Sequence, residues 1–381
     1  MAGFGFSEEQ EMFRREVRNF VQKELVPGAK ERAKQGVLSK DIIKKVAGMG
    51  LMGLRVPEKY GGQAADWITV GIAIEELAKG DFITSFLPTE PILCNYLFEN
   101  NKSIAEEWLP AVVKGDKIFC LALTEAEVGS DAANIKTRAL KDGDSYVLSG
   151  EKLSISFGPI ADAAIVFAKT DPKAGFRGIS AFLLPLNHPG VSRSLMPMMG
   201  WRPIGQAIIT LDNVRIPKEY LLGEEGKGFV SVMKQFDFTR PALALQALAL
   251  AEVSLEEAIN YTKQRHAFGQ PLAKYEGISF KIAEDYTMVE AARLLSYRAL
   301  WLRDQGLPHA KESAMCKWFG PKVAVRVVHD ALLMHGHVGY SEEYPLQQRL
   351  KEAIGFEIAD GTAEIMKLII VREILGKEYV P

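Results

Sequence analysis

The feature that most constrains the fold is a pattern that changes twice along the chain. Up to about residue 117, apolar residues recur at helical spacing, as in "FRREVRNFVQKEL". From about 118, short runs rich in β-branched residues alternate with turn signals such as Asp142-Gly143. Long helical patterns then return and continue to the end. We expect a mainly α protein with a central β domain, divided into residues 1–117 (helical), 118–225 (β) and 226–381 (helical).

Local signals predict where individual helices begin. Ser7 with Gln10, and Ser103 with Glu106, have the spacing of a capping box, which satisfies free backbone N–H groups at a helix start. Pro241 suits the first turn of a helix, because that position needs no N–H. The longest helical pattern, "ALALQALALAEVSLEEAINYTKQR", is therefore expected to begin near residue 241.

Charge and cysteine usage narrow the class of protein. Lys and Arg number 46 against 48 Asp and Glu, a net charge of -2, which offers no electrostatic footprint for nucleic acid or an anionic membrane. Three cysteines without a CxxC pair support neither a disulfide framework nor a zinc site. With no apolar run approaching ~18 residues and no apolar signal segment near the N-terminus, we expect a soluble, cytoplasmic protein.

One loop after a β-rich run could hold a ligand. In "LTEAEVGSDAANI", Gly129, Ser130 and Asp131 follow a strand that ends near Thr124. Such a loop can offer backbone N–H groups and hydroxyls to a phosphate or to a polar ring edge. The same residues are equally typical of a strand that ends in an Asx turn.

Five blocks, taken together, resemble the acyl-CoA dehydrogenase family. They are "LTEAEVGSDA", "LLGEEGKGF", "RHAFGQPL", "HGHVGYSEEYPLQQRLKEA" and "DGTAEIMKLIIVREIL", and they follow the family's order over essentially the whole chain. The resemblance implies an N-terminal helical domain, a middle β-barrel-like domain and a C-terminal four-helix bundle, assembled as a homotetramer. It also implies FAD, α,β-dehydrogenation of an acyl-CoA thioester, and an electron-transferring flavoprotein as acceptor.

The resemblance also implies roles for individual residues around FAD. Arg265 and Phe268 match positions that reach the FAD of a neighbouring subunit, although Arg265 could instead be a solvated loop residue. The other implied contacts are Leu121, Leu123, Thr124, Gly129, Ser130, Ser154, Ser156, Glu276, Leu333, Gly336, His337, Thr362 and Glu364. Ser154 stands where the family often has a tryptophan. A metal at His335 and His337 is not expected, because no Asp, Glu or Cys ligand lies near them in the sequence.

The acyl-CoA contacts implied by the resemblance lie in "FDFTRP". Asp237, Thr239 and Arg240 keep the residue types that touch the CoA chain, although the segment also reads as a helix cap before Pro241. Ser130 and Gly361 are further substrate-binding positions by the same resemblance.

The catalytic base implied by the resemblance is Asp360, where most of the family has a glutamate. A carboxylate can remove the α-proton of a thioester, but aspartate is one methylene, roughly 1.5 Å, shorter. Glu90, in "FLPTEPILCNYL", lies in the segment that matches the floor of the acyl pocket. It is either a second acid–base group or a solvent-facing residue between two prolines.

Three functions follow from these observations. The first is an acyl-CoA dehydrogenase for a branched or cyclic acyl group. The second is a flavin oxidase, since nitroalkane oxidases resemble the family and use an aspartate with a nearby arginine; here Lys367 is the nearest cation in the sequence after Asp360. The third is a relative kept as a binding or structural subunit, with or without flavin.

Overall fold

The first helix begins at the predicted capping box. The structure, a computed structural model, describes residues 5–89 and 101–379. The Ser7 hydroxyl accepts from Gln10 N while the Gln10 side chain accepts from Ser7 N, and α1 follows as Glu8–Phe20. The second predicted capping box is wrong: Asn101 caps the helix α6 (Lys102–Val113), and its Oδ1 accepts from Ile104 N at 3.2 Å. Asparagine is as good a cap as serine.

The described chain forms two compact units. The first consists of Met1–Lys30, Trp67–Ser85 and Asp237–Pro381, and the second of Glu31–Asp66 and Phe86–Phe236. The boundary falls inside the long helix α7 (Gly228–Gln264). The fold class is confirmed as mainly α with a central β domain. The exact domain boundaries stay predictions.

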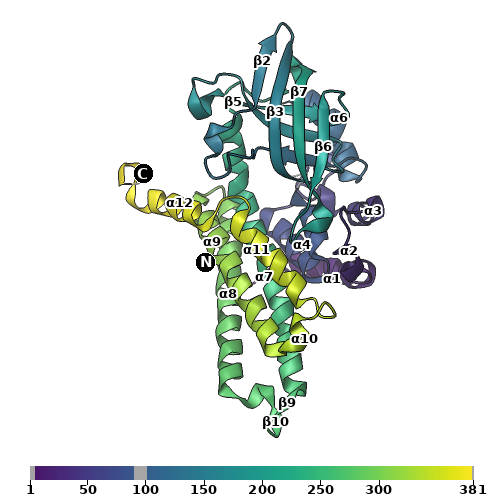
Figure 1. The fold of residues 1–381 in the computed structure, drawn as a ribbon, viewed down its shortest axis with the longest axis vertical. Coiled ribbons are helices and arrows are strands. Elements are labelled where there is room, and N and C mark those ends of the chain that lie inside the picture. Colours follow the sequence, from purple (N-terminus) through teal and green to yellow (C-terminus); the bar gives the residue numbers. More distant parts are fainter. Residues whose placement is uncertain (1–4, 90–100, 380–381) are drawn as a thin grey trace. The chain divides into compact units, whose positions relative to one another are not determined.

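The first unit is built from helices that pack around α7 and α9 (Figure 1). Its longest elements after α7 are α8 and α9, and α8, α11 and α12 all pack against α9. Their bounds are α4 (Trp67–Gly80), α8 (Glu276–Asp304), α9 (Ala310–His335), α10 (His337–Tyr340), α11 (Leu346–Ile358) and α12 (Ala363–Leu375). The run Ala242–Ala251 of α7 is buried throughout and has Gln246 as its one polar residue, which is typical of a core helix.

The helix α7 begins at Gly228, so the prediction that Pro241 marks a helix start is wrong. A proline inside a helix lacks the N–H that would bond to the carbonyl four residues earlier. That carbonyl belongs to Asp237, and the hydroxyl of Ser313 on α9 donates to it at 2.6 Å. A side chain from a distant part of the sequence thus satisfies the carbonyl, and the helix continues through the proline.

The second unit contains an eight-stranded sheet. Its path is β6-β7-β3-β2-β4-β5-β8, with β1 paired in parallel to β4. The strands are β1 (Phe119–Ala122), β2 (Arg138–Asp142), β3 (Ser145–Ser156), β4 (Ala163–Lys169), β5 (Ile179–Pro185), β6 (Val191–Met196), β7 (Gln206–Pro217) and β8 (Leu221–Leu222). Helix α6 packs on a core that includes Phe119, Ile165 and Leu183. Strand β1 therefore lies inside the unit, and the loop after it is held by that core.

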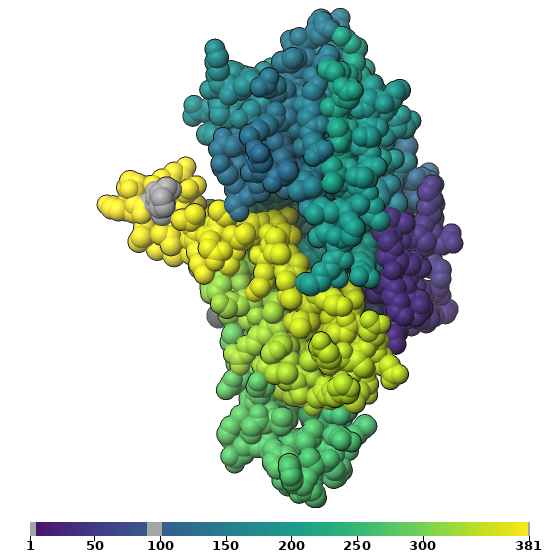
Figure 2. Space-filling model, in the orientation of Figure 1, coloured from purple at the N-terminus to yellow at the C-terminus, as the bar shows by residue number. Residues whose placement is uncertain are grey.

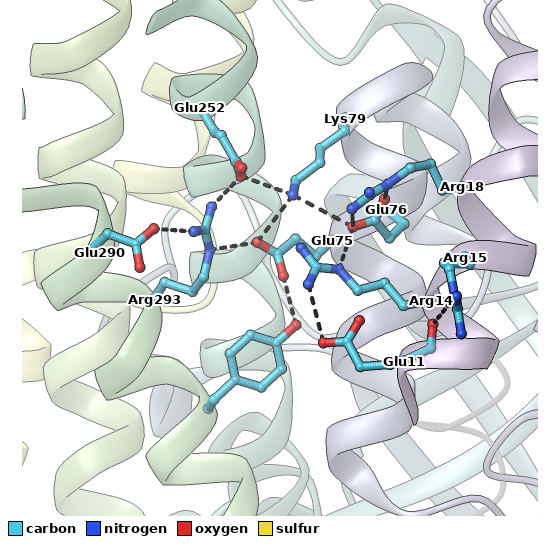
Figure 3. A network of polar contacts seen from close by, with 11 residues as sticks. Glu11, Arg14, Arg15, Arg18, Glu75, Glu76, Lys79, Glu252, Glu290 and Arg293 are labelled. Carbon is cyan, nitrogen blue, oxygen red and sulfur yellow. Dashed lines mark hydrogen bonds and ion pairs between the residues drawn. The ribbon is translucent and has the colours of Figure 1, made fainter. Parts of the chain in front are cut away.

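A network of charges crosses the first unit (Figure 3). Glu75 and Glu76 on α4 are both 2% exposed. Glu75 accepts from Arg293 of α8 at 2.7 Å and from the Tyr297 hydroxyl at 2.7 Å. Glu76 accepts from two arginines of α1, Arg14 at 3.0 Å and Arg18 at 2.9 Å. These hydrogen bonds, opposed by burial, lower the pKa of Glu76 to about 2. The paired charges join α1, α4 and α8.

A second buried carboxylate is less well compensated. Asp285 on α8 has no exposed surface, and neither of its oxygens accepts a hydrogen bond from a described residue. Its ion partner is Arg326 of α9, 3.3 Å away. Burial, reinforced by the nearby Asp330 carboxylate, raises the pKa of Asp285 to about 6.

Across residues 5–89 and 101–379, none of the helices combines the length and the apolar content that a membrane crossing requires.

Candidate functional site

The predicted base lies in a strained turn between two helices. Helix α11 ends at Ile358 and α12 begins at Ala363, so few residues connect them. Asp360 has φ +53° and Gly361 has φ +104°. Positive φ at a residue other than glycine is uncommon and often marks a functional position, although aspartate tolerates it better than most residues. The turn leaves Asp360 half-buried.

The Asp360 carboxylate is bound by a neighbouring helix. The hydroxyl of Thr239, on α7, donates to Oδ2 of Asp360 at 2.6 Å. Thr239 is 5% exposed, so this bond is largely shielded from water. A hydrogen bond to an ionised acceptor is shorter and stronger than a neutral one. Thr239 therefore fixes one carboxylate oxygen, while the other carries no such contact from Thr239.

Two cations flank the same carboxylate. Lys317 on α9 has no exposed surface, and its Nζ donates to the carbonyl of Gly361 at 2.9 Å. Burial lowers the pKa of Lys317 to about 8, against the opposing attraction of Asp360. Arg240 is 5% exposed and pairs with Asp237 at 3.0 Å. Burial also lowers the pKa of Arg240 and raises that of Asp237, and each shift is opposed by the other's charge.

The structure thus brings five predicted residues together. Thr239 donates directly to Asp360, Lys317 donates to Gly361, and the paired residues Asp237 and Arg240 stand before and after Thr239 along α7. Thr362 follows as the N-cap of α12, half-buried, and Glu364 is exposed in its first turn. A fixed, half-buried carboxylate is suited to accept a proton from a bound substrate.

In the second unit, the predicted strand and loop are held by a buried ion pair. Lys152 has no exposed surface, and its Nζ donates to the carbonyl of Leu123 at 3.0 Å and to Glu125 at 2.8 Å. Glu125 also accepts from Thr137 N at 3.0 Å. Burial lowers the pKa of Lys152 to about 8, and Glu125 opposes that shift. The pair fixes the backbone at the end of β1, next to Thr124.

The loop that follows is open to a ligand. Leu121 and Thr124 are half-buried, Leu123 is buried, and Gly129 and Ser130 are exposed. A Cβ added at Gly129 would meet no atom within 4 Å. On β3, Ser154 is exposed with φ +56°, and the Ser156 hydroxyl accepts from Gln206 at 3.0 Å. Hydroxyls, free space and strand-end backbone groups together fit the polar edge of a flavin, so the described residues of this unit are compatible with FAD.

The remaining predicted cofactor residues lie at the surface of the first unit. Arg265 and Phe268 lie at the hairpin of β9 (His266–Ala267) and β10 (Gln270–Pro271), which forms the green tip beyond α7 and α8 in Figures 1 and 2. The Phe268 side chain is 100% exposed, with φ +49°. The other four positions, all exposed, are Glu276 at the start of α8 and Leu333, Gly336 and His337 around the end of α9.

Two further sequence predictions concern Glu90 and the histidines. Glu90 lies outside the described residues. Nδ1 of His335 contacts the carbonyl of Ala331 at 2.7 Å, and its ring stacks on Tyr261. Within residues 5–89 and 101–379, no group of three or more His, Cys, Asp or Glu side chains is placed to hold a metal ion.

The two buried lysines were not predicted from the sequence. Lys317 does carry a signal, because in "AMCKWF" a lysine interrupts an apolar run, whereas Lys152 in "EKLSIS" has mostly polar neighbours and carries none. A long cationic side chain in such a position needs a carboxylate or carbonyl partner. In both cases that partner belongs to a segment that was predicted to bind cofactor or substrate.

Comparison with known proteins identifies the family. Three family models match: the N-terminal domain of acyl-CoA dehydrogenase over residues 7–116, its middle domain over 120–214 and its C-terminal domain over 226–375. An acyl-CoA dehydrogenase of Bacillus subtilis is 38% identical over 378 residues, covering 97% of this chain and 99% of that protein. The subunit CarC of the caffeyl-CoA reductase-Etf complex of Acetobacterium woodii is 34% identical, covering 98% and 100%.

A solved structure agrees with these sequence relatives. Butyryl-CoA dehydrogenase from Megasphaera elsdenii superposes with a TM-score of 0.94 at 35% identity, covering 98% of this chain and 100% of that one. The family models account for most of the chain, and the sequence and structural relatives extend the likeness to nearly all of it. The chain therefore belongs to the acyl-CoA dehydrogenase family, whose members are FAD-dependent oxidoreductases that act on acyl-CoA thioesters.

Proposed function

We propose that the protein oxidises an acyl-CoA thioester at its α and β carbons, with Asp360 as the base that removes the α-proton. The observation that carries this proposal is the Asp360 turn, in which a carboxylate at positive φ is bound by Thr239 and flanked by two cations. FAD, when bound, accepts the hydride that leaves the β carbon. The thioester loses one proton and one hydride, and a double bond forms between the two carbons.

The residues of the chain divide the work around the α-proton. The hydroxyl of Thr239 occupies one oxygen of Asp360 and leaves the other to take the proton. Removing the proton places negative charge on the thioester carbonyl, and a cationic surrounding stabilises such charge. Arg240 and Lys317 supply positive charge next to the proposed base, Asp360. The half-buried position keeps the carboxylate accessible to substrate while limiting its hydration.

We further propose that the acyl group is branched or cyclic. Ser154, the residue at the position where relatives often carry a tryptophan, is small and exposed. A smaller side chain leaves more room for a broad acyl group than an indole would. Anaerobic titration of the yellow protein with straight, branched and cyclic acyl-CoA thioesters tests this, because the loss of flavin absorbance reports oxidation of each one. Faster bleaching by straight-chain thioesters than by every branched or cyclic one would contradict it.

The role of Asp360 is tested with Asp360→Asn, which keeps the size of the side chain but removes the base. We expect flavin bleaching by acyl-CoA to fall by several orders of magnitude, with the FAD content unchanged. Asp41→Asn, on an exposed face of helix α3 (Lys40–Gly48), is the matched control and retains full bleaching. Undiminished bleaching in Asp360→Asn would exclude this residue as the base.

We also propose that the chain works as a homotetramer with an electron-transferring flavoprotein as acceptor. A phenylalanine that is fully exposed at a projecting hairpin favours a contact with another copy of the chain. An apolar groove of about 420 Å³, lined by Leu295, Met315, Trp318, Phe319, Lys367, Ile370 and Val371, supports the same association. The acceptor is supported by the related subunit of a reductase-Etf complex.

The homotetramer and the role of Phe268 in it can both be measured. Sedimentation of the purified protein should give four times the chain mass of 42.1 kDa. The variant Phe268→Ala should retain less FAD after gel filtration if this side chain touches the cofactor of a neighbour. A purified wild-type protein that sediments as a monomer with FAD bound would contradict the homotetramer. FAD retention in Phe268→Ala equal to that of the wild type would contradict the contact of this side chain with a neighbour's cofactor.

A flavin oxidase remains the second candidate, because Asp360 has cations beside it in space. The charges of Arg240 and Lys317, which are distant in sequence, act on Asp360, whereas Lys367 lies over the Trp318 ring. Rapid consumption of oxygen with a nitroalkane, and none of the bleaching with acyl-CoA, would favour the oxidase.

A further inference from the structure

Lys317 occupies a position that is costly for a lysine. It lies on α9 in the run Ala314–Phe319, and its side chain has no exposed surface. Burying a cation without compensation is strongly unfavourable. The only hydrogen bond described for its ammonium goes to the carbonyl of Gly361, at 2.9 Å. This buried charge is therefore compensated by a hydrogen bond to one backbone oxygen of the turn that carries Asp360.

The charges around Lys317 come from three elements. Asp360 attracts it from the turn, Glu357 attracts it from α11, and Arg240 repels it from α7. Neighbouring charges of both signs thus act on this ammonium, and one of the two carboxylates that attract it is the proposed base, Asp360. A lysine that served only to fill space would need none of these partners.

The length of the base makes the backbone position decisive. An aspartate places its carboxylate with one torsion fewer than a glutamate does, so the side chain has less freedom to correct a displaced backbone. A displacement of about 1 Å can lower a rate by on the order of a hundredfold. Thr239 fixes the carboxylate directly, but the direction in which it points also depends on the peptide between Asp360 and Gly361. Lys317 is bonded to the oxygen of the next peptide.

We propose that Lys317 is a positioning residue for the proposed base: from α9 it holds the Gly361 carbonyl, and so it fixes the left-handed turn that aims the Asp360 carboxylate. This inference rests on the proposed role of Asp360. Two helices would then support the site: α7 binds the side chain of Asp360, and α9 binds the backbone of its turn. The ammonium charge adds to the hydrogen bond by attracting the ionised carboxylate.

The test uses proton transfer alone. Acetyl-CoA has α-protons but no β carbon, so the rate at which the holoenzyme exchanges those protons with deuterated water reports the base without any oxidation. The variants are Lys317→Met, which keeps the unbranched shape and most of the length of the side chain without its charge, and Lys322→Met, an exposed lysine of the same helix, as the matched control. Melting temperature, FAD content and the dissociation constant of acetyl-CoA are measured for each.

We expect Lys317→Met to lose on the order of a hundredfold in exchange rate, with the dissociation constant within about twofold of the wild type, while Lys322→Met exchanges normally. Since the ammonium loses its proton at a pH of about 8, the wild-type rate should also show an inflection there that is missing in Lys317→Met. A purely structural lysine would produce no such inflection.

The outcomes separate this inference from the proposed function. Exchange within threefold of the wild type in Lys317→Met, or an inflection near pH 8 that survives in it, overturns the positioning role while Asp360→Asn still loses exchange. Exchange that persists in Asp360→Asn overturns the base and this inference with it. Should Lys317→Met fail to fold, Lys317→Gln and the wild-type pH profile apply the same criteria.

Discussion

The hydrogen bond from Thr239 to Asp360 leads to a prediction whose size can be worked from the structure. At 2.6 Å, with a donor only 5% exposed, this is a shielded bond to a carboxylate. Such bonds contribute roughly 1.5–3 kcal/mol. Only the part of this contribution that persists in the transition state affects the rate, so the full value is an upper limit. At about 1.36 kcal/mol for each factor of ten, Thr239→Val should slow the limiting rate of flavin reduction by up to roughly 150-fold. Valine keeps the shape and the branched Cβ of threonine, so packing changes little.

The assay is anaerobic stopped-flow reduction of the holoenzyme over a range of acyl-CoA concentrations. It separates the limiting rate from the dissociation constant, and therefore separates the two roles open to Thr239. A residue that positions the base lowers the limiting rate, whereas a residue that binds the CoA chain raises the dissociation constant. Thr239→Ser is the control, because it retains the hydroxyl. A limiting rate in Thr239→Val within threefold of the wild type, or one equally slow in Thr239→Ser, would refute the reasoning.

Three predictions concern stability, each measured by urea unfolding. Glu76 has a folded pKa of about 2, below its unfolded value, so its charge stabilises the fold above pH 4.5. The free energy of unfolding should therefore fall by about 3 kcal/mol as this carboxylate is protonated between pH 4.5 and pH 2. The same loss of stability on acidification in Glu76→Gln would contradict this. Asp285 has a pKa raised to about 6, so its contribution to the stability of the fold is lost as pH rises from 3.8 through 6. Asp285→Asn should therefore be up to about 3 kcal/mol more stable than the wild type at pH 7.5, and equal to it near pH 4. Ser313→Ala should lower the free energy of unfolding by about 1–3 kcal/mol, because it leaves the Asp237 carbonyl without a donor. Adding Pro241→Ala should recover part of that loss by restoring the N–H of the helix. A double variant no more stable than Ser313→Ala would exclude this account of how the helix passes through the proline.

The sequence predicted those parts of the fold that depend on local pattern. The capping box at Ser7 and the alternation of helical and β-rich runs involve neighbours within a few residues, and both are confirmed. Where the structure of a segment depends on a residue far away in the sequence, the local pattern did not predict it. Pro241 has the properties of a helix start, yet Ser313 of α9 allows the helix to pass through it.

The candidate site divides in the same way. The position of Asp360 could be inferred from its own segment, by resemblance to a family. The contacts that shape it come from α7 and α9, through Thr239 and Lys317, and no pattern within "DGTAEI" indicates either one. A buried lysine is visible in sequence only as an interruption of an apolar face, and its partner is not. Glu90, which lies outside the described residues, remains a prediction.

The left-handed turn at Asp360 also limits which amino acids the protein can evolve there. A left-handed backbone costs an ordinary L-residue roughly 1–2 kcal/mol, and aspartate is among the few exceptions because its short side chain can bond to nearby backbone. A mutation from aspartate to glutamate needs a single nucleotide change, but it would lose that tolerance while extending the carboxylate toward the substrate. Identity and conformation at residue 360 are therefore coupled: a switch of base would succeed only after the turn between α11 and α12 had relaxed.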